Sequence, residues 1–431
     1  MDRRLVFLVV SPVAVFAAGI GFLAAEARAR PKSPTIYWPT DVVEEMRVLV
    51  ERDYVDEIDD ARARGLFYAA CKAYLNGLDP YCEFLTPEER REMDQETQGE
   101  FGGVGILQSR SGEGIRIRGA RIGDPAWKAG IRAGDLIVSV DGVEATGESG
   151  AKALPRLRGK PDTAVTVAWM PRDGGPRREA PVVRSLVKID SITGVQVLDR
   201  KAGIGYLRLV RFQDNTGPDL RAALKRLRAD GARSFVVDLR SDYGGVLPAA
   251  VACADAFLGA GTQPIVVTKS RQGFERPGHM PHSDPDDDLT APLVLLVDAH
   301  TASAAEVLAG ALQDHRRAIL VGERTYGKFL VQRIVPLPGE DVAVRLTTAR
   351  YYTPQGRNLQ RDDARNVRGG LVPEIPVIPP EDGVKALRAW WDDQVGLDWD
   401  LMPPGPDAPD APDDPVLAKA VEILRDADAL R

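Results

Sequence analysis

The sequence predicts a multidomain α/β (α+β) protein with an N-terminal helical segment, a small β-rich domain and a larger domain of alternating strands and helices. Apolar residues at three- and four-residue spacing between Asp41 and Leu78 indicate the helical segment. Short β-like runs separated by glycine turns, from Gly99 to about Leu186, indicate the β-rich domain. From about Val187 strand-like and helix-like runs alternate, which is typical of a parallel sheet.

The composition fits a globular, multidomain chain without a nucleic-acid partner. The 431 residues suffice for about two or three domains. Hydrophobic residues make up 44% and charged residues 28%, and the net charge of −7 comes with no Lys/Arg-rich stripe. No residue cluster has metal-ligand spacing, and the acidic loop Met280–Asp288 lacks the glycine and glutamate of an EF-hand, so we expect neither metal nor cofactor. We interpret the cysteines as structural thiols and leave a disulfide between the first two open: Cys71, Cys82 and Cys253.

The N-terminus predicts export to the cell envelope or periplasm. Residues 5–25 form an uncharged run of about the length that spans a bilayer, and Arg3 and Arg4 would stay on the cytoplasmic side. The small residues of Ala25–Ala29 allow cleavage by a signal peptidase as an alternative. The length of the run favours an uncleaved anchor in the inner membrane.

The elements of the helical and β-rich parts follow from local pattern. Residues 41–59 and 60–78 each predict an amphipathic helix, and "GLDPYCEFLTPEERREMDQE" predicts a turn and a short charged helix. In the β-rich part, "GVGILQ", "IRIRGA", "DLIVSVDG" and "AVTVAWM" predict strands, while "PAWKAG" and "GESGAKALPRL" predict short helices.

In the larger domain, "GIGYLRLV", "SFVVDLR", "PLVLLVD" and "RAILVGE" predict strands separated by three helices. "LVQRIVPL" and "VAVRLTTARYY" predict two further strands without a helix between them. A Pro/Asp-rich linker, Pro403–Pro415, precedes a closing amphipathic helix. We therefore expect five parts. A signal anchor with its linker takes residues 1–36, a helical segment 37–97 and a β-rich domain 98–186. An α/β core takes residues 187–395, and a linker with a C-terminal helix takes 396–431.

Gly322–Lys328 nearly matches a phosphate-binding loop but lacks its context. Phe329 stands where a serine or threonine would bind magnesium, and a strand-like run rather than a helix follows. A phosphate needs the N-terminus of a helix at this point. The missing context argues against nucleotide binding and leaves the role of Lys328 to be explained.

Ser303 begins a helix after a buried strand and a tight turn, and it has two interpretations. With Glu306 it fits a capping box, in which serine and glutamate satisfy each other's free amides. The same strand–turn–helix setting exposes the nucleophile of α/β-hydrolases beside backbone N–H donors. One hydroxyl cannot easily do both, so the two interpretations compete.

A nucleophilic serine needs a base, and Lys328 is the candidate. The four histidines are not convincingly placed: His279, His282, His300 and His315. A desolvated lysine favours its neutral form and can then accept the hydroxyl proton. The strand after the helix returns the chain toward Ser303, and Gly327 gives the backbone freedom for a close approach.

"TASAAEVLAGALQD" with "AILVGERTYGKFLVQ" resembles the signature of the carboxyl-terminal processing peptidases, serine proteases with an embedded PDZ domain. The resemblance implies a crotonase/ClpP-like α/β protease core, Ser303 as nucleophile, Lys328 as general base and Gln332 orienting the lysine. Asp314 takes a supporting position. "LDPYCEFLTPEE" (Leu78–Glu89) is similar to the family's "LDPHSSYLSPEE", and the similarity extends from about residue 41 to about residue 379.

The chain departs from the family pattern at three places. Phe329 replaces a glycine beside the base, and Ala305 replaces the last serine of the nucleophile motif. "RSDYGG" (Arg240–Gly245) replaces "RNNPGG", the turn that helps to build the oxyanion hole. The resemblance implies that an N–H of Gly244 or Gly245 joins that of Ala304 there.

The PDZ resemblance implies capture of accessible protein C-termini by the glycine loop of "EFGGVGI", with four candidate residues: Gly102, Gly103, Val104 and Gly105. The implied function is an envelope serine endopeptidase that cleaves near captured C-termini through an acyl-enzyme. The alternative is a membrane-tethered peptide-binding adaptor with an inactive protease core. A crotonase-like acyl-CoA enzyme shares the layering, but export and the PDZ segment disfavour it. The sequence leaves the oligomeric state open.

Overall fold

The computed structural model describes residues 40–111, 113–147, 150–261, 263–273, 275–282, 290–338, 341–391, 399–401 and 412–429. The predicted membrane segment, residues 5–25, lies outside these ranges. Among the helices within them, none has the length and apolar character needed to cross a bilayer. The chain divides into two compact units, Met1–Ala70 and Cys71–Arg431.

The two amphipathic helices predicted near the N-terminus are present as α2 (Thr40–Asp53) and α3 (Asp60–Asn76). α2 carries ion pairs along one side, from Arg47 to Glu44 and Glu51 at i,i+3 and i,i+4 spacing. Its apolar side chains are exposed to solvent, among them Val42, Val43, Met46 and Leu49.

The predicted turn and charged helix are present, and a short strand lies between them. Asp79 closes the turn, and α4 (Pro87–Gln98) begins with a capping box in which Thr86 and Glu89 bond each other's N–H groups. It ends at Gly99 in the left-handed conformation, with φ of 73°. The sequence analysis missed β1 (Glu83–Leu85), because three residues carry no readable period and the strand exists through its pairing with β18.

The β-rich domain forms a twisted sheet around its own core. The sheet has the order β20-β4-β5-β7-β8, with β3 on β4 and β6 on β5. Its core packs around Ile117, Ile137 and Trp169. β2 pairs with β9 at the entry and exit of the domain. The elements are β2 (Glu100–Gly103), β3 (Ile106–Ser111), β4 (Gly114–Arg121), α5 (Pro125–Lys128), β5 (Leu136–Val140), β6 (Val143–Glu144), α6 (Gly150–Ala153), the 3-10 helix η2 (Leu154–Leu157), β7 (Ala164–Met170), β8 (Arg178–Val183), β9 (Ser185–Lys188) and β20 (Trp399–Leu401).

The larger domain confirms the predicted parallel sheet. The strand order is β10-β11-β12-β15-β16-β19, parallel from β11 to β19, with β10 antiparallel at the edge. Strands buried on both faces read as continuous apolar runs, as in "LVLLV" of β15. The strands are β10 (Ile192–Asp199), β11 (Ile204–Leu209), β12 (Ser234–Asp238), β15 (Leu293–Val297), β16 (Ile319–Gly322) and β19 (Ile375–Pro376).

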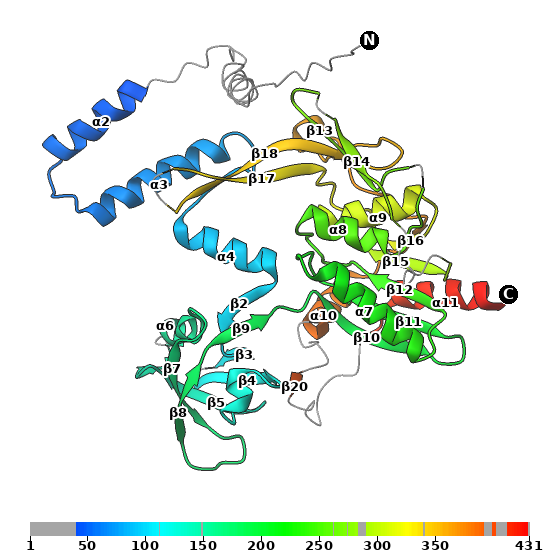
Figure 1. Cartoon of the computed structure of the whole chain (residues 1–431), viewed down its shortest axis with the longest axis horizontal. Coiled ribbons are helices and arrows are strands. Elements are labelled where there is room, and N and C mark those ends of the chain that lie inside the picture. The colour runs from blue at the N-terminus through cyan, green and yellow to red at the C-terminus, as the bar shows by residue number, and fades with distance from the viewer. Residues whose placement is uncertain are drawn as a thin grey trace, which may run out of the picture. The chain divides into compact units, whose positions relative to one another are not determined.

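Helices cover both faces of this sheet. α7 (Thr216–Ala229), α8 (Leu247–Asp255) and α9 (Ala304–Asp314) lie side by side and bury the main hydrophobic core (Figure 1). The closing helix, α11 (Pro415–Ala429), packs against β12, β15 and β16 through a second core. The result is a helix–sheet–helix sandwich in which the carboxyl ends of β12, β15 and β16 share one edge.

A second sheet holds the two late strands predicted without a helix between them. β17 (Leu330–Pro336) and β18 (Ala343–Tyr352) form a long hairpin, and β18 also pairs with β1 and with β13 (Val266–Ser270), followed by β14 (Glu275–His279) (Figure 1). The sequence analysis missed β13, β14 and α10 (Glu381–Trp391), as well as the short 3-10 helix η3 (Asp363–Arg365). All three cysteines are free, so the Cys71–Cys82 disulfide that the sequence left open is not formed.

Candidate active site

Two loops at the carboxyl edge of the sheet are bound to each other. One follows β12 and the other follows β15. The Asp298 carboxylate accepts hydrogen bonds from the N–H groups of Ser241 at 3.0 Å and of Thr301 at 2.9 Å. The Thr301 hydroxyl donates to the Leu239 carbonyl at 2.9 Å. These bonds fix the second loop against the first immediately before Ser303.

Ser303 adopts the sharp turn that the strand–turn–helix pattern predicts. Its backbone has φ of 57° and ψ of −118°, a conformation that a non-glycine residue holds only where its surroundings enforce it. Gly244 lies against it, and a Cβ there would stand 2.9 Å from the Ser303 Cβ. Only glycine fits at position 244, so the two loops can approach this closely.

The Glu306 carboxylate connects the serine turn to the lysine loop. It is fully buried on α9 and accepts four hydrogen bonds. Oε2 accepts from the N–H groups of Ser303 at 2.9 Å and Lys328 at 2.8 Å. Oε1 accepts from the Thr325 hydroxyl at 2.6 Å and the Gly327 N–H at 2.7 Å. Burial raises the pKa of Glu306, and the four donors oppose that shift.

Glu306 therefore does more than the capping box predicted. Besides the N–H of Ser303, its carboxylate holds the backbone of the segment that carries Lys328. The carboxylate half of the predicted capping box is therefore present, with Glu306 bonded to the N–H of Ser303.

Lys328 is half-buried, and its surroundings lower the pKa of its amine. Burial and then the nearby Arg345 guanidinium lower the pKa of Lys328, while Glu306 and Asp79 act in the opposite direction. Its Nζ lies 4.7 Å from the centre of the Tyr81 ring. Within the described residues, this amine enters no hydrogen bond or ion pair, with Ser303 or with any other group.

The residues beside Lys328 serve packing and alignment. The Phe329 ring is fully buried in the main core, and its centre lies 4.6 Å from the centre of the Tyr351 ring. The Tyr351 hydroxyl donates to the Ser303 carbonyl at 3.0 Å and also contacts the Lys328 carbonyl. The Gln332 amide donates to the Thr347 hydroxyl at 3.3 Å from β17.

The loop after β12 determines which N–H groups face the serine. The Gly244 N–H donates to the Asp242 carboxylate at 2.7 Å. The Gly245 N–H takes no part in the two hydrogen bonds that join Phe212 to this loop, which use Gly244 O and Val246 N. Ala304 is the first residue of α9, where the N–H groups of a helix have no partner within the helix. Gly245 and Ala304 are therefore the candidate donors to an oxyanion, and Gly244 is already engaged.

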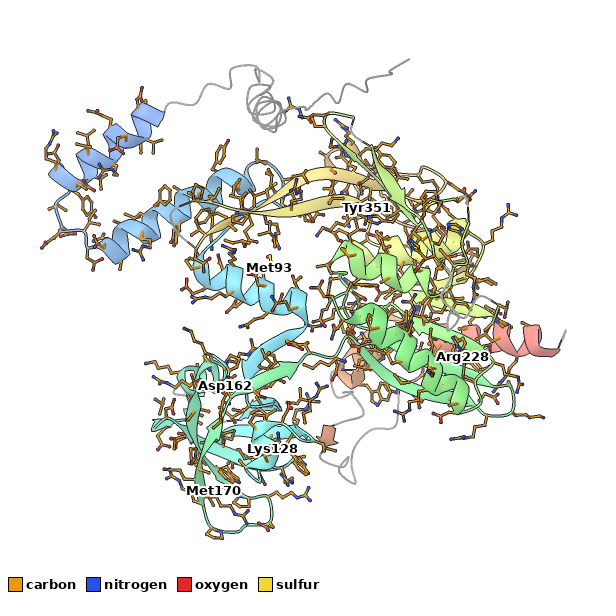
Figure 2. All side chains as sticks on the ribbon, viewed as in Figure 1. Met93, Lys128, Asp162, Met170, Arg228 and Tyr351 are labelled. Atoms are coloured by element: carbon orange, nitrogen blue, oxygen red, sulfur yellow. The ribbon has the colours of Figure 1, made fainter. Side chains whose placement is uncertain are left out.

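All of the predicted catalytic and oxyanion residues line one cavity of about 680 Å³. They are Ser303, Lys328, Gln332, Ala304, Gly244 and Gly245. Its walls also include Met93 of α4 and Tyr351 of β18, both labelled in Figure 2. The apolar part of the cavity wall comes from α4, the start of α8, α9 and β17. Two arginines, Arg211 and Arg345, also line the cavity.

The remaining predicted residues lie outside this cavity. Asp314 is buried at the end of α9 and accepts from the Gln355 N–H at 2.9 Å and from Arg357. Gly102 and Gly103 lie in β2, whereas Val104 and Gly105 form the connection to β3. Gly105 has φ of 76°, and a Cβ there would collide with Asp124.

Sequence reasoning missed three residues of the site. Asp242 was visible within the departure of "RSDYGG" from the family pattern, but its contacts were not, and Tyr81 was not singled out within "LDPYCEFLTPEE". Tyr351 left no signal, because it is one of two tyrosines in a strand-like run. Long-range packing alone brings these side chains to Ser303 and Lys328.

Comparison with known proteins defines the family. The sequence model of Peptidase family S41 matches residues 203–377, and that of the PDZ domain matches residues 116–169. A carboxy-terminal-processing protease of Bartonella bacilliformis is 36% identical over 337 residues, which cover 77% of this chain and 73% of the relative. The chain belongs to the carboxyl-terminal processing protease family.

Two further proteins are similar to this chain. A carboxyl-terminal-processing protease of Synechocystis is 34% identical over 349 residues, 80% of this chain and 78% of the relative. A solved photosystem II D1 C-terminal processing protease is 32% identical, covering 78% of this chain and 86% of that chain with a TM-score of 0.43. This carboxyl-terminal processing protease is thus a serine protease that contains a PDZ domain.

The Asp242→Asn variant should make folding stability less dependent on pH. Asp242 is fully buried, and burial raises its pKa well above the ordinary value, although the Gly244 N–H, Arg208 and Arg211 oppose the shift. Folding therefore takes up a proton above the unfolded pKa of about 4, and stability falls as pH rises from there. An asparagine side chain keeps an oxygen that accepts from the Gly244 N–H, and it does not titrate, so this loss of folding stability with rising pH disappears.

Urea unfolding of parent and variant at pH 5, 6.5 and 8 provides the measurement. The advantage of the variant should grow with pH, by up to about 1.4 kcal/mol per pH unit while Asp242 stays protonated in the fold. An advantage that is constant across the pH range would contradict the assignment.

Proposed function

We propose that this protease captures the C-termini of proteins through its PDZ domain and cleaves near them, with Ser303 as nucleophile and Lys328 as general base. The observation that carries the proposal is the shared cavity, which brings both side chains together with Gln332 and the backbone of Gly245 and Ala304. The cavity has the size of an ordinary ligand site, at about 680 Å³.

The chemistry requires the neutral form of the lysine. Ser303 Oγ attacks the carbonyl carbon of the substrate, and its proton passes to Lys328 Nζ. The N–H groups of Gly245 and Ala304 stabilise the negative oxygen of the tetrahedral intermediate. The carbon–nitrogen bond then breaks, and the Lys328 ammonium returns its proton to the leaving amine. Water, deprotonated by the same lysine, hydrolyses the acyl-enzyme.

Two further residues have supporting roles in this proposal. Gln332 orients the Lys328 amine from the neighbouring strand β17. Asp314 acts at a distance, because its carboxylate holds the loop at Gln355 and Arg357 beside the end of α9. The lowered pKa of Lys328, which burial and Arg345 cause, supports the assignment of the base.

The lining of the cavity favours apolar substrate segments. Val246, Leu247, Val307 and Val331 contribute apolar side chains near Ser303. An extended substrate chain with small or apolar side chains can bury them here and exclude water from the amine. Exclusion of water strengthens the electrostatic interactions that catalysis uses.

The PDZ domain, for which we propose the limits 98–186, is suited to hold a substrate tail. β3 pairs with β4 on one side, and no other strand among the described residues pairs with it. A peptide can add to that free edge as a further strand. The N–H groups at Val104 and Gly105, directly before β3, would then bind the terminal carboxylate.

We also propose that residues 5–25 anchor the protease in the inner membrane, with the catalytic part in the periplasm. The support is the uncharged run itself, flanked by Arg3 and Arg4. The full-length protein should sediment with membranes after washing at alkaline pH, and a variant that begins at residue 37 should not. Equal release of both would exclude the anchor.

Ser303→Ala and Lys328→Ala should each lower kcat/KM about a thousandfold or more, because the nucleophile and its base act as one unit. The assay measures cleavage of an unstructured peptide with an apolar tail, and thermal unfolding checks that each variant is folded. Lys201→Ala, at an exposed lysine far along the sequence from the site, is the matched control and should retain the parent rate. Cleavage by both active-site variants at the parent rate would contradict the mechanism. A parent protein that binds tails without cleaving them would favour the adaptor.

Amidation of the substrate C-terminus should raise KM about tenfold or more with little change in kcat, because the carboxylate is used for capture and not for bond cleavage. The comparison uses two peptides of identical sequence, one with a free carboxylate and one with an amide. Equal KM values would exclude carboxylate capture and leave the Ser303–Lys328 chemistry untouched.

A further inference from the structure

The Tyr81 ring is held rigidly beside Lys328. The Asp79 carboxylate accepts from the N–H groups of Tyr81 at 2.7 Å and Cys82 at 2.9 Å, and Cys82 Sγ also donates to it at 3.2 Å. The Thr347 N–H donates to Cys82 Sγ at 3.4 Å, which ties this turn to β18. β1 continues from the turn as a partner of β18. The ring therefore has a fixed position relative to the sheet that carries the lysine.

The ring faces the amine with its π surface. Lys328 Nζ lies 4.7 Å from the ring centre, within the range of a cation–π interaction. The hydroxyl group of Tyr81 lies 3.5 Å from the hydroxyl group of Tyr326. The Arg361 guanidinium lies 5.6 Å from the centre of the Tyr326 ring. Burial and the Tyr326 hydroxyl raise the pKa of Tyr81, so the ring is a neutral phenol.

A π face attracts an ammonium and not a neutral amine. The base of the proposed reaction must be neutral, so this contact stabilises the form of Lys328 that cannot act. The charged groups facing the amine are Arg345 from β18, which disfavours the ammonium, and Glu306 from α9 and Asp79 from the turn, which favour it. Tyr81 thus stabilises the ammonium form of Lys328 in a position in which the amine has no hydrogen bond to Ser303 Oγ.

We propose that Tyr81 is a positioning residue that holds the Lys328 ammonium in a resting place away from Ser303. This inference rests on the proposed role of Lys328 as base. Activation then consists of two linked events, loss of the proton from Nζ and movement of the amine from the ring to the serine. A substrate chain in the cavity promotes both, because it removes water from the amine.

Tyr81→Leu and Tyr81→Phe separate the ring face from the hydroxyl. Leucine removes the π surface and keeps an apolar side chain, whereas phenylalanine keeps the π surface. In the leucine variant the acid limb of the kcat/KM profile should move about one unit to lower pH, with a higher rate near neutral pH and an unchanged KM. The phenylalanine variant should keep the acid limb of the parent. Identical profiles for the two variants would overturn the proposal.

Direct titration of the amine does not depend on turnover. In the Ser303→Ala background, NMR of isotope-labelled lysine follows the Lys328 amine, and Tyr81→Leu should lower its pKa while Tyr81→Phe should not. Tyr352→Leu is the matched control, because Tyr352 makes the same kind of contact with Lys269, at 5.0 Å, outside the cavity. An equal pKa of Lys328 in the leucine and phenylalanine variants would refute the resting place, even if Ser303→Ala and Lys328→Ala confirm the mechanism. A lowered pKa together with active Ser303→Ala would support the contact and refute the mechanism.

Discussion

The buried carboxylate of Glu306 is the interaction on which the site depends. Its two oxygens accept from the Ser303 N–H on one side and from the Gly327 and Lys328 N–H groups on the other. A buried polar group is stable only when its hydrogen bonds are satisfied, and here four donors do so. Because those donors come from two separate loops, the same bonds that satisfy the carboxylate also fix the turn at Ser303 relative to the segment that carries Lys328.

The parallel sheet supplies the frame for this arrangement. The strands β12 and β15 end side by side, so the loops that follow them meet at one edge, and Asp298 bonds the two together. The strained backbone of Ser303 is tolerated because these bonds hold it on both sides. Gly244 completes the frame, since any side chain there would collide with Ser303. Rigid elements position the reacting groups, and the loops contribute the chemistry.

The backbone and the amine of Lys328, the base in our proposal, have different partners. The backbone of Lys328 is fixed by Glu306, whereas its amine lies over the Tyr81 ring. Binding of substrate in a cavity changes the local dielectric, and a desolvated ammonium loses its proton more readily. The proposed movement of the amine would therefore keep the protease inactive in the absence of substrate while the backbone of the site stays in place.

Local chemistry in the sequence determined the alternating strands and helices, the strand–turn–helix at Ser303, the glycines at 244 and 327, and the strand that follows Lys328. These follow from periodicity and from the backbone freedom of glycine, which act over a few residues. The family resemblance joined Ser303 to Lys328 and Gln332. Only the tertiary structure decided that Glu306 bonds both loops, that Asp242 engages Gly244, and that Tyr81 meets the amine. These contacts join residues from different elements, and sequence spacing cannot report distances that packing of the whole chain creates.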